Sequence, residues 1–290
     1  RTMRADVWRQ FRRHKGAMFG LFVMVLIILF VFVGPFVWPH DPFEIDPNNF
    51  NKSSTGEFPA GTDNLGRDII ARSMVGGRIS IAVGFAAMLF GLLVGVLVGV
   101  LAGFIKWLDA PLMRVTDVFL ALPLLPLLLV VILFFKAPMT ERFGESLGIF
   151  LLVVFMIGIT SWMQTARIVR GDVLALKERE FILAARSIGT PAGKMITRHL
   201  LPNVLSPIMV SAALGLATAI ITESALSFLG VGFPSDFPTW GKLLADAVPR
   251  MQEFPERVLL PGIAISLTVL GVNYLGDGLR DALDPRIRGM

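Results

Sequence analysis

Residues 79–105 have the sequence ISIAVGFAAMLFGLLVGVLVGVLAGFI, which contains no charged side chain. A helix needs roughly 20 apolar residues to cross a bilayer, because about 30 Å of hydrocarbon is covered at about 1.5 Å per residue. This stretch is therefore predicted to be a transmembrane helix, and the rest of the chain is interpreted around it.

Five other stretches are long and apolar enough to cross a membrane. Together with the first they give six predicted spans, at 18–38, 79–105, 115–135, 147–163, 203–228 and 258–277. The 290-residue chain is 54% apolar and only 17% charged, whereas roughly a quarter of the residues in soluble domains are charged. The predicted fold class is all-α, a polytopic membrane protein, and a soluble enzyme is disfavoured.

The basic residues indicate how the spans are oriented. If the connections alternate across the membrane, 18 Lys and Arg residues lie on one side and nine on the other. Because cytoplasmic connections are normally richer in these residues, both termini are predicted to be cytoplasmic. The predicted segments are a cytoplasmic tail (1–17), a first transmembrane helix (18–38), an extracytoplasmic segment (39–78), a core of five transmembrane helices (79–277) and a second cytoplasmic tail (278–290).

Two connections are long enough to have structure of their own. The extracytoplasmic segment ends in NLGRDIIARSMVGGR (64–78), which is predicted to form a short helix at the membrane interface. The cytoplasmic loop 164–202 combines seven basic residues with a regular apolar pattern, which favours helices over a linker.

Residues 178–203, EREFILAARSIGTPAGKMITRHLLPN, predict two short helices in that cytoplasmic loop. The first helix ends at Gly189, a turn follows through Thr190 and Pro191, and the second ends near Pro202. The small residues Ala184 and Ala185 allow a partner to approach closely. A helix pair held under the membrane in this way can transmit a force to the span that follows it.

The chain has no recognisable catalytic or metal-binding motif. It has no Cys, and its three His residues (His14, His40 and His199) are not spaced as metal ligands. The sequence GTPAGKM (189–195) lacks the spacing and the Ser or Thr of a phosphate-binding loop. No cofactor, metal or nucleic acid is expected to bind this chain, and an ATP-driven function would need ATPase activity from another polypeptide.

Glycines recur at every fourth residue of the second predicted span. Gly91, Gly95, Gly99 and Gly103 would lie on one helix face, where another helix backbone can approach closely. One interpretation is helix packing within this subunit, and the other is a sliding or hinge surface used in conformational change.

Glu223 is the only acidic residue well inside the predicted apolar regions. A carboxylate is costly in hydrocarbon, so it should face a polar partner or a cavity. Two interpretations remain open, a structural hydrogen bond to a neighbouring helix and a place in a substrate path or gate.

The cytoplasmic loop resembles the EAA motif of ABC importer permeases, which is Glu-Ala-Ala, three residues, Gly, nine residues, Ile, one residue and Leu-Pro. Ala184, Ala185, Gly189 and the pair Leu201-Pro202 match this pattern, while Leu183 and His199 replace its Glu and Ile. Four further stretches resemble the oligopeptide, dipeptide and nickel branch of these permeases: 61–84, 225–234 (ALSFLGVGFP), 238–241 (PTWG) and 275–286 (LGDGLRDALDPR).

This resemblance implies a type I importer permease of the C type, in the inner (plasma) membrane of a prokaryotic cell. Such a chain forms half of a peptide translocation path with a second homologous permease subunit. The implied partners are two ABC ATPase subunits, which bind ATP and Mg, and an extracytoplasmic substrate-binding protein. The implied ATPase-coupling residues are Ala184, Ala185, Arg186, Gly189 and Pro202.

Alternatives remain for the cargo and for the class. A nickel chelate or another small solute is possible within the same family. An ion-coupled secondary transporter would be expected to have several ionisable residues at mid-membrane, and Glu223 alone does not meet this expectation. A passive structural subunit would not explain the elaborate cytoplasmic loop.

Overall fold

The computed structural model describes residues 3–234 and 236–283, and within them the regular secondary structure is helical apart from one isolated bridge between Thr62 and Asp68, which confirms the all-α prediction. Arg1, Arg286 and Arg288 of the basic-residue count lie outside these residues, as do 284–290 of the predicted tail. The helices are α1 (Met3–Arg13), α2 (Lys15–Ile28), α3 (Gly34–Val37), α4 (Ile69–Phe104), α5 (Lys106–Ala121), α6 (Leu124–Phe143), α7 (Glu145–Ile159), α8 (Trp162–Lys177), α9 (Glu180–Ser187), α10 (Ala192–Lys194), α11 (Leu205–Phe228), α12 (Trp240–Ala247) and α13 (Pro255–Leu283).

Six helical stretches of the described chain are long and apolar enough to cross a membrane, as predicted. They are Lys15–Val37, Ile69–Phe104, Leu124–Phe143, Glu145–Lys177, Leu205–Phe228 and Pro255–Leu283. The first and fifth agree with the predicted spans to within three residues, whereas the boundaries of the others differ by more.

The short interfacial helix predicted in residues 64–78 is wrong, because these residues lead directly into α4. Asp68 caps that helix by accepting a hydrogen bond from the Ile70 amide at 3.1 Å, and Ile69 is buried in its first turn. Gly77 does not end the helix. A Cβ atom there would lie 2.5 Å from Val31 and 2.6 Å from Trp240, so the missing side chain allows both to pack against α4.

The predicted third span, 115–135, is divided between α5 and α6. Leu122 has an extended backbone (ψ 138°), as expected for a residue that precedes a proline. The apolar helix of sufficient length is α6, which ends at Phe143. The predicted fourth span, 147–163, is too short, because α7 and α8 continue helical structure from Glu145 to Lys177 with a break at Thr160 and Ser161.

The first span is hydrogen-bonded to α4 close to a proline, Pro35. Pro35 cannot donate to the Val31 carbonyl four residues before it, and residues Leu29–Val33 form a π-helical turn. The Arg78 side chain donates instead, from Nε to the Val31 oxygen at 2.9 Å and from Nη2 to the Phe32 oxygen at 3.2 Å. The carbonyl that Pro35 leaves without a partner is therefore satisfied by α4.

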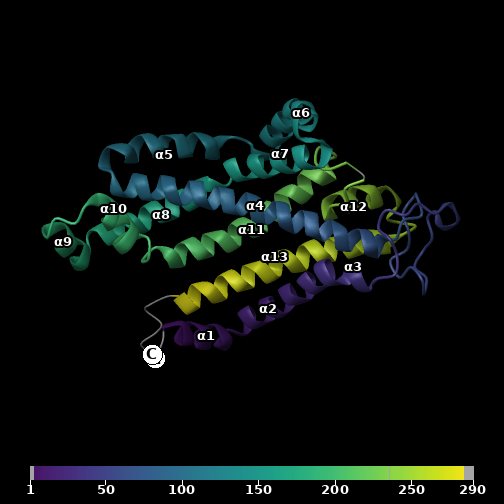
Figure 1. The fold of residues 1–290 in the computed structure, drawn as a ribbon, viewed down its shortest axis with the longest axis horizontal. Helices are drawn as coiled ribbons and strands as arrows, with labels where there is room; N and C mark the ends of the chain where they lie inside the picture. The colour runs from purple at the N-terminus through teal and green to yellow at the C-terminus, as the bar shows by residue number, and fades with distance from the viewer. Residues whose placement is uncertain (1–2, 235, 284–290) are drawn as a thin grey trace.

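The helices form an elongated bundle with α4 in its interior (Figure 1). α4 packs against α7, α8 and α11, while α13 packs against α2 and α11. In Figure 1, α1, the C-terminal end of α13, α9 and α10 lie at one end of the bundle, and α3, α12 and the segment 38–68 lie at the other. α1 and the C-terminal end of α13 are thus on the same side as the loop that contains α9.

Four of the glycines of α4, namely Gly91, Gly95, Gly99 and Gly103, lie in its contact with α7 and α8. A Cβ atom at Gly95 would lie 2.7 Å from the Trp162 carbonyl oxygen, and one at Gly99 would lie 2.6 Å from the Ala166 carbonyl oxygen. A Cβ atom at Gly91 would lie against the Ser161 side chain, and one at Gly103 would lie 2.8 Å from the Val173 side chain. The stripe therefore lies in a backbone contact within this chain.

We predict that Gly95→Leu separates α4 from α8. Overpacking typically costs about 1–3 kcal/mol, and here the obstacle includes a backbone carbonyl that cannot rotate away. The melting temperature of the purified protein should fall, as measured by the loss of helical circular dichroism. Gly262→Leu is the matched control, because its nearest neighbour would be a Leu244 methyl at 3.8 Å. Equal melting temperatures for the two variants would contradict the prediction.

Candidate functional site

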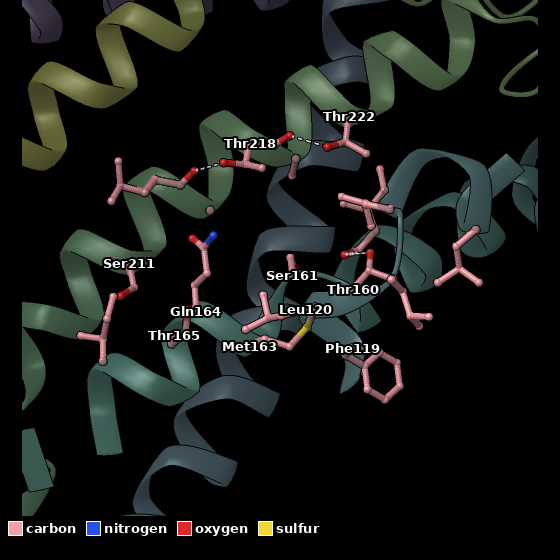
Figure 2. Close-up of a pocket in the computed structure, with 18 residues that line it drawn as sticks. Phe119, Leu120, Thr160, Ser161, Met163, Gln164, Thr165, Ser211, Thr218 and Thr222 are labelled. Carbon is pink, nitrogen blue, oxygen red and sulfur yellow. Dashed lines mark hydrogen bonds between the residues drawn. The ribbon is translucent and has the colours of Figure 1, made fainter. Parts of the chain in front are cut away.

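A cavity of about 210 Å³ lies between three parts of the fold, the link from α5 to α6, the junction of α7 and α8, and one face of α11 (Figure 2). No charged residue lines it. Seven lining residues have polar side chains, namely Thr160, Ser161, Gln164, Thr165, Ser211, Thr218 and Thr222. Of the other eleven lining residues, ten have apolar side chains and one is Gly215.

The local sequence explains how α11 presents polar groups within an apolar segment. Ser211, Gly215, Thr218 and Thr222 follow one another at helical spacing and so share one face. The Thr218 hydroxyl donates to the Leu214 carbonyl at 2.9 Å, and the Thr222 hydroxyl donates to the Thr218 carbonyl at 2.8 Å. Both side chains therefore satisfy their donors within their own helix.

The break between α7 and α8 supplies the second polar wall. The Thr160 hydroxyl donates to the Met156 carbonyl at 2.8 Å, and the Ser161 hydroxyl donates to the Gly158 carbonyl at 3.1 Å. Gln164 follows one turn later, and Figure 2 shows its carboxamide extending from α8 toward α11.

An open groove of about 1200 Å³ lies next to the cavity, at the end of the bundle that contains α9. The two share Ile168, Ser211 and Leu214, so they adjoin each other along α8 and α11 and are together called the passage. Unlike the cavity, the groove carries charged side chains, among them Asp172, Glu178, Arg179, Glu180 and Arg280.

Sequence reasoning did not find this cavity. The available signals were the polar cluster TSWMQT (160–165) inside an apolar stretch, and the helical spacing of Ser211, Thr218 and Thr222. Neither signal says that the two segments face each other, because that depends on how α8 and α11 pack.

Glu223 lies elsewhere, inside the contact of α11 with α4 and α12. Its side chain is fully buried and is not among the residues that line the cavity. The Ser80 hydroxyl donates to Oε2 at 2.9 Å, and the Ser227 hydroxyl donates to Oε1 at 2.7 Å. Ser80 in turn accepts from the Trp240 amide at 3.2 Å. This arrangement favours the structural hydrogen bond over the gate.

The coupling loop has a buried face and an exposed face. Ile182 and Ala185 of α9 are buried, and they pack in one cluster with Met195, Leu200 and Val204. The backbone turns at Gly189, whose φ of +79° is a conformation that favours glycine. α10 and the π-helical turn Met195–Leu200 follow, and they lead into the turn before α11.

The exposed face contains the rest of the predicted coupling residues. Ala184, Arg186, Gly189 and Pro202 are exposed, and a Cβ atom added at Gly189 would meet no described atom within 4 Å beyond its two chain neighbours. Three apolar side chains, Phe181, Leu183 and Ile188, are 45%, 44% and 84% exposed. Leu183, which occupies the place of the glutamate in the motif, therefore presents an apolar group on this face.

The loop is fastened to the ends of α4 and α8. Its buried cluster includes Val100 of α4 together with Val169 and Val173 of α8. Lys177 donates from Nζ to the Gly103 and Phe104 carbonyls at 3.0 and 3.1 Å, which caps the end of α4.

α5 is connected to α8 by an ion pair near the same end. Arg170 donates from Nη2 to the Asp109 carboxylate at 2.8 Å, and this contact holds the pKa of Asp109 below its usual range. A displacement of the coupling loop would therefore reach α4, α5 and α8 together.

Comparison with known families agrees with this geometry. Residues 91–289 match the family model described as binding-protein-dependent transport system inner membrane component. Residues 2–54 match the N-terminal TM domain of oligopeptide transport permease C. The chain belongs to the binding-protein-dependent permeases of ABC importers.

Curated relatives cover almost the whole chain. The oligopeptide permease OppC of Bacillus subtilis is 39% identical over 98% of this chain and 90% of its own length. The dipeptide permease DppC of Alkalihalophilus pseudofirmus is 37% identical over 98% of this chain and 90% of its own length. The glutathione permease GsiD of Escherichia coli is 40% identical over 100% of this chain and 92% of its own length.

The fold is also similar to a solved structure. An inward-facing crystal structure of the methionine ABC transporter MetNI aligns with a TM-score of 0.57 at 18% identity, over 72% of this permease and 95% of that chain. The expected type I importer permease fold is thereby confirmed.

We predict that Glu223→Gln and Glu223→Leu behave differently. Gln keeps the shape and can still accept a hydrogen bond from a serine, whereas Leu leaves the Ser80 and Ser227 hydroxyls without their acceptor. A buried polar group that loses its partner costs about 1–3 kcal/mol, so Leu should lower the melting temperature clearly and Gln only slightly. Transport per assembled complex, measured in proteoliposomes, should be unchanged in the Gln variant. A Gln variant that assembles normally but does not transport would instead support a role in the path.

Proposed function

We propose that this permease forms one half of the translocation path of an ATP-driven peptide importer. The observation that carries the proposal is the uncharged, hydroxyl-lined cavity that continues into an open groove along α8 and α11. A neutral lining of this kind tolerates cargo with different side chains. The oligopeptide, dipeptide and glutathione permeases similar to this chain support peptides as the cargo.

A second, homologous permease subunit would supply the opposite wall of the path. The cavity is lined by α11, the link from α5 to α6 and the junction of α7 and α8, and these parts of the chain do not enclose it fully. The pairing of two homologous permeases is implied by the family resemblance, and an incomplete cavity within one chain is consistent with it.

The complex is proposed to contain two ATPase subunits, which would bind ATP and Mg, and one of them would dock on the exposed face of α9 while the other docks on the second permease. The exposed apolar side chains of Phe181, Leu183 and Ile188 suit a protein surface better than water. An extracytoplasmic binding protein would deliver cargo at the opposite end of the bundle, where the segment 38–68 and α12 lie.

The proposed location is the inner (plasma) membrane, with both termini and α9 in the cytoplasm. This orientation is supported by the excess of basic residues on one side. It is also supported by the shared position of α1, α9 and the C-terminal end of α13 at one end of the bundle.

We predict that the complete complex, reconstituted in proteoliposomes with loaded binding protein, accumulates labelled peptide only when ATP is supplied. An ionophore mixture that abolishes ion gradients should leave uptake unchanged, because the proposed energy source is ATP hydrolysis. Uptake that requires an ion gradient would indicate a secondary transporter. ATP-driven uptake of a nickel chelate without any uptake of peptides would identify the nickel chelate as the cargo.

We predict that Gly189→Trp uncouples the ATPases. The new side chain would project from the exposed turn into space that this chain leaves open, and it would obstruct a docked partner. Membrane insertion should persist, because it depends on the apolar spans. Co-purification of the ATPases, or the stimulation of ATP hydrolysis by loaded binding protein, should be lost.

Two further variants separate obstruction from other effects of changing this loop. Gly189→Ala imposes a similar strain on the positive φ without the bulk, so it should retain most of the coupling. Arg186→Glu should weaken docking less than Gly189→Trp, since a charge at the edge of an interface mainly alters association. Full ATPase binding and stimulation in Gly189→Trp would rule out this loop as the coupling element.

A further inference from the structure

Ser211 and Gln164 are two of the cavity's polar side chains that form no hydrogen bond with another described residue, and Thr165, which packs against Gly95 of α4, is a third. The hydroxyls of Thr160, Ser161, Thr218 and Thr222 donate to carbonyls of their own helices. The Ser211 hydroxyl is buried, with 7% of the residue exposed, and has no partner within the described part of the chain. The Gln164 carboxamide also forms no hydrogen bond with another described residue.

These two groups lie where the cavity meets the groove. Ser211 lines both of them. Gln164 lines the cavity and is one helical turn before Ile168, which lines both. They project from α11 and α8, the two helices that continue along the whole passage. Ser211 therefore lies where the cavity and the groove adjoin, and Gln164 lies close to that boundary.

The chemistry of the two groups matches that of a peptide main chain. A carboxamide has N–H donors and a carbonyl acceptor, which are the same groups that a peptide bond presents, and a hydroxyl can donate or accept. The buried Ser211 hydroxyl without a partner is destabilising and calls for an occupant that can satisfy it, while the exposed Gln164 carboxamide is free to bind the same occupant. The rest of the lining carries no charged side chain among the described residues. The hydroxyls of Thr160, Ser161, Thr218 and Thr222 already donate to carbonyl groups of the protein.

We propose that Gln164 and Ser211 form a subsite that hydrogen-bonds the main chain of the cargo as it leaves the cavity. The inference rests on the proposed peptide-import function and adds the feature of the peptide that is recognised. Because peptide bonds are common to all peptides, such a subsite accepts many sequences, and it discriminates against cargo whose main-chain N–H groups are blocked.

The test uses the complete complex in proteoliposomes at saturating loaded binding protein. The two cargoes are trialanine and an analogue that is N-methylated on the amide nitrogen of its central residue. The loading of each cargo onto the binding protein is measured separately. Gln164→Met keeps the length of the side chain and removes its donors and acceptor. It should lower maximal trialanine uptake by about threefold to tenfold, as expected for the loss of one or two hydrogen bonds. Ser211→Ala should have a smaller effect in the same direction.

The decisive readout is the ratio of the two uptake rates. The wild type should import trialanine faster than the methylated analogue, and in Gln164→Met this ratio should fall toward one. Thr218→Val is the matched control, since its hydroxyl lines the same cavity but already donates to the Leu214 carbonyl. Its ratio should equal that of the wild type.

Several outcomes would overturn the inference. If Gln164→Met slows both cargoes by the same factor, the side chain has only a structural role. If the wild type imports peptides and Gln164→Met does so equally well, the subsite is wrong while the proposed function stands. If the wild-type complex imports no peptide at all, both are wrong.

Discussion

The backbone contact between α4 and α8 is the constraint on which the rest of this permease depends. The glycines of α4 leave no side chain between the two helices, so carbonyls of α8 approach the α4 backbone directly. This contact fixes the rotation of α8: Thr165 faces Gly95, and the preceding residue, Gln164, therefore points away from α4 toward the cavity. The same helix continues to Lys177, which caps α4 and begins the coupling loop. One packed pair of helices thus positions both the cavity and the loop.

Polar groups within the membrane-spanning region are satisfied in two different ways. Hydroxyls such as those of Thr218 and Thr222 donate to their own helices, so they can line a cavity without needing other protein groups. Glu223 is satisfied between helices, through Ser80 and Ser227, and it connects α11 to α4 and α12. Because an unsatisfied carboxyl at this depth would be costly, the second arrangement holds the helices together and leaves the passage uncharged.

Hydropathy was sufficient to predict six apolar helices, because it measures the property that a bilayer selects. It did not predict where the helices break. The division at Leu122 and Pro123 follows from proline sterics inside an unbroken apolar run. The predicted second span began after Arg78 because of its charge, but Arg78 lies inside α4 and binds carbonyls of the first span 46 and 47 residues away in the chain. The motif likewise did not reveal that Ala185 faces the chain's own core while Ala184 is exposed.

The position of the coupling loop suggests how a motion beneath the membrane could change the width of the path. α9 is packed against Val169 and Val173 of α8, and the π-helical turn that follows it leads into α11. The two helices at the ends of the loop are therefore the same two that carry Gln164 and Ser211 along the passage. Under the proposed function, a force on α9 need not travel through a remote network of residues. It would act directly on both walls, with the break at Thr160 and Ser161 as the place where α8 can tilt relative to α7.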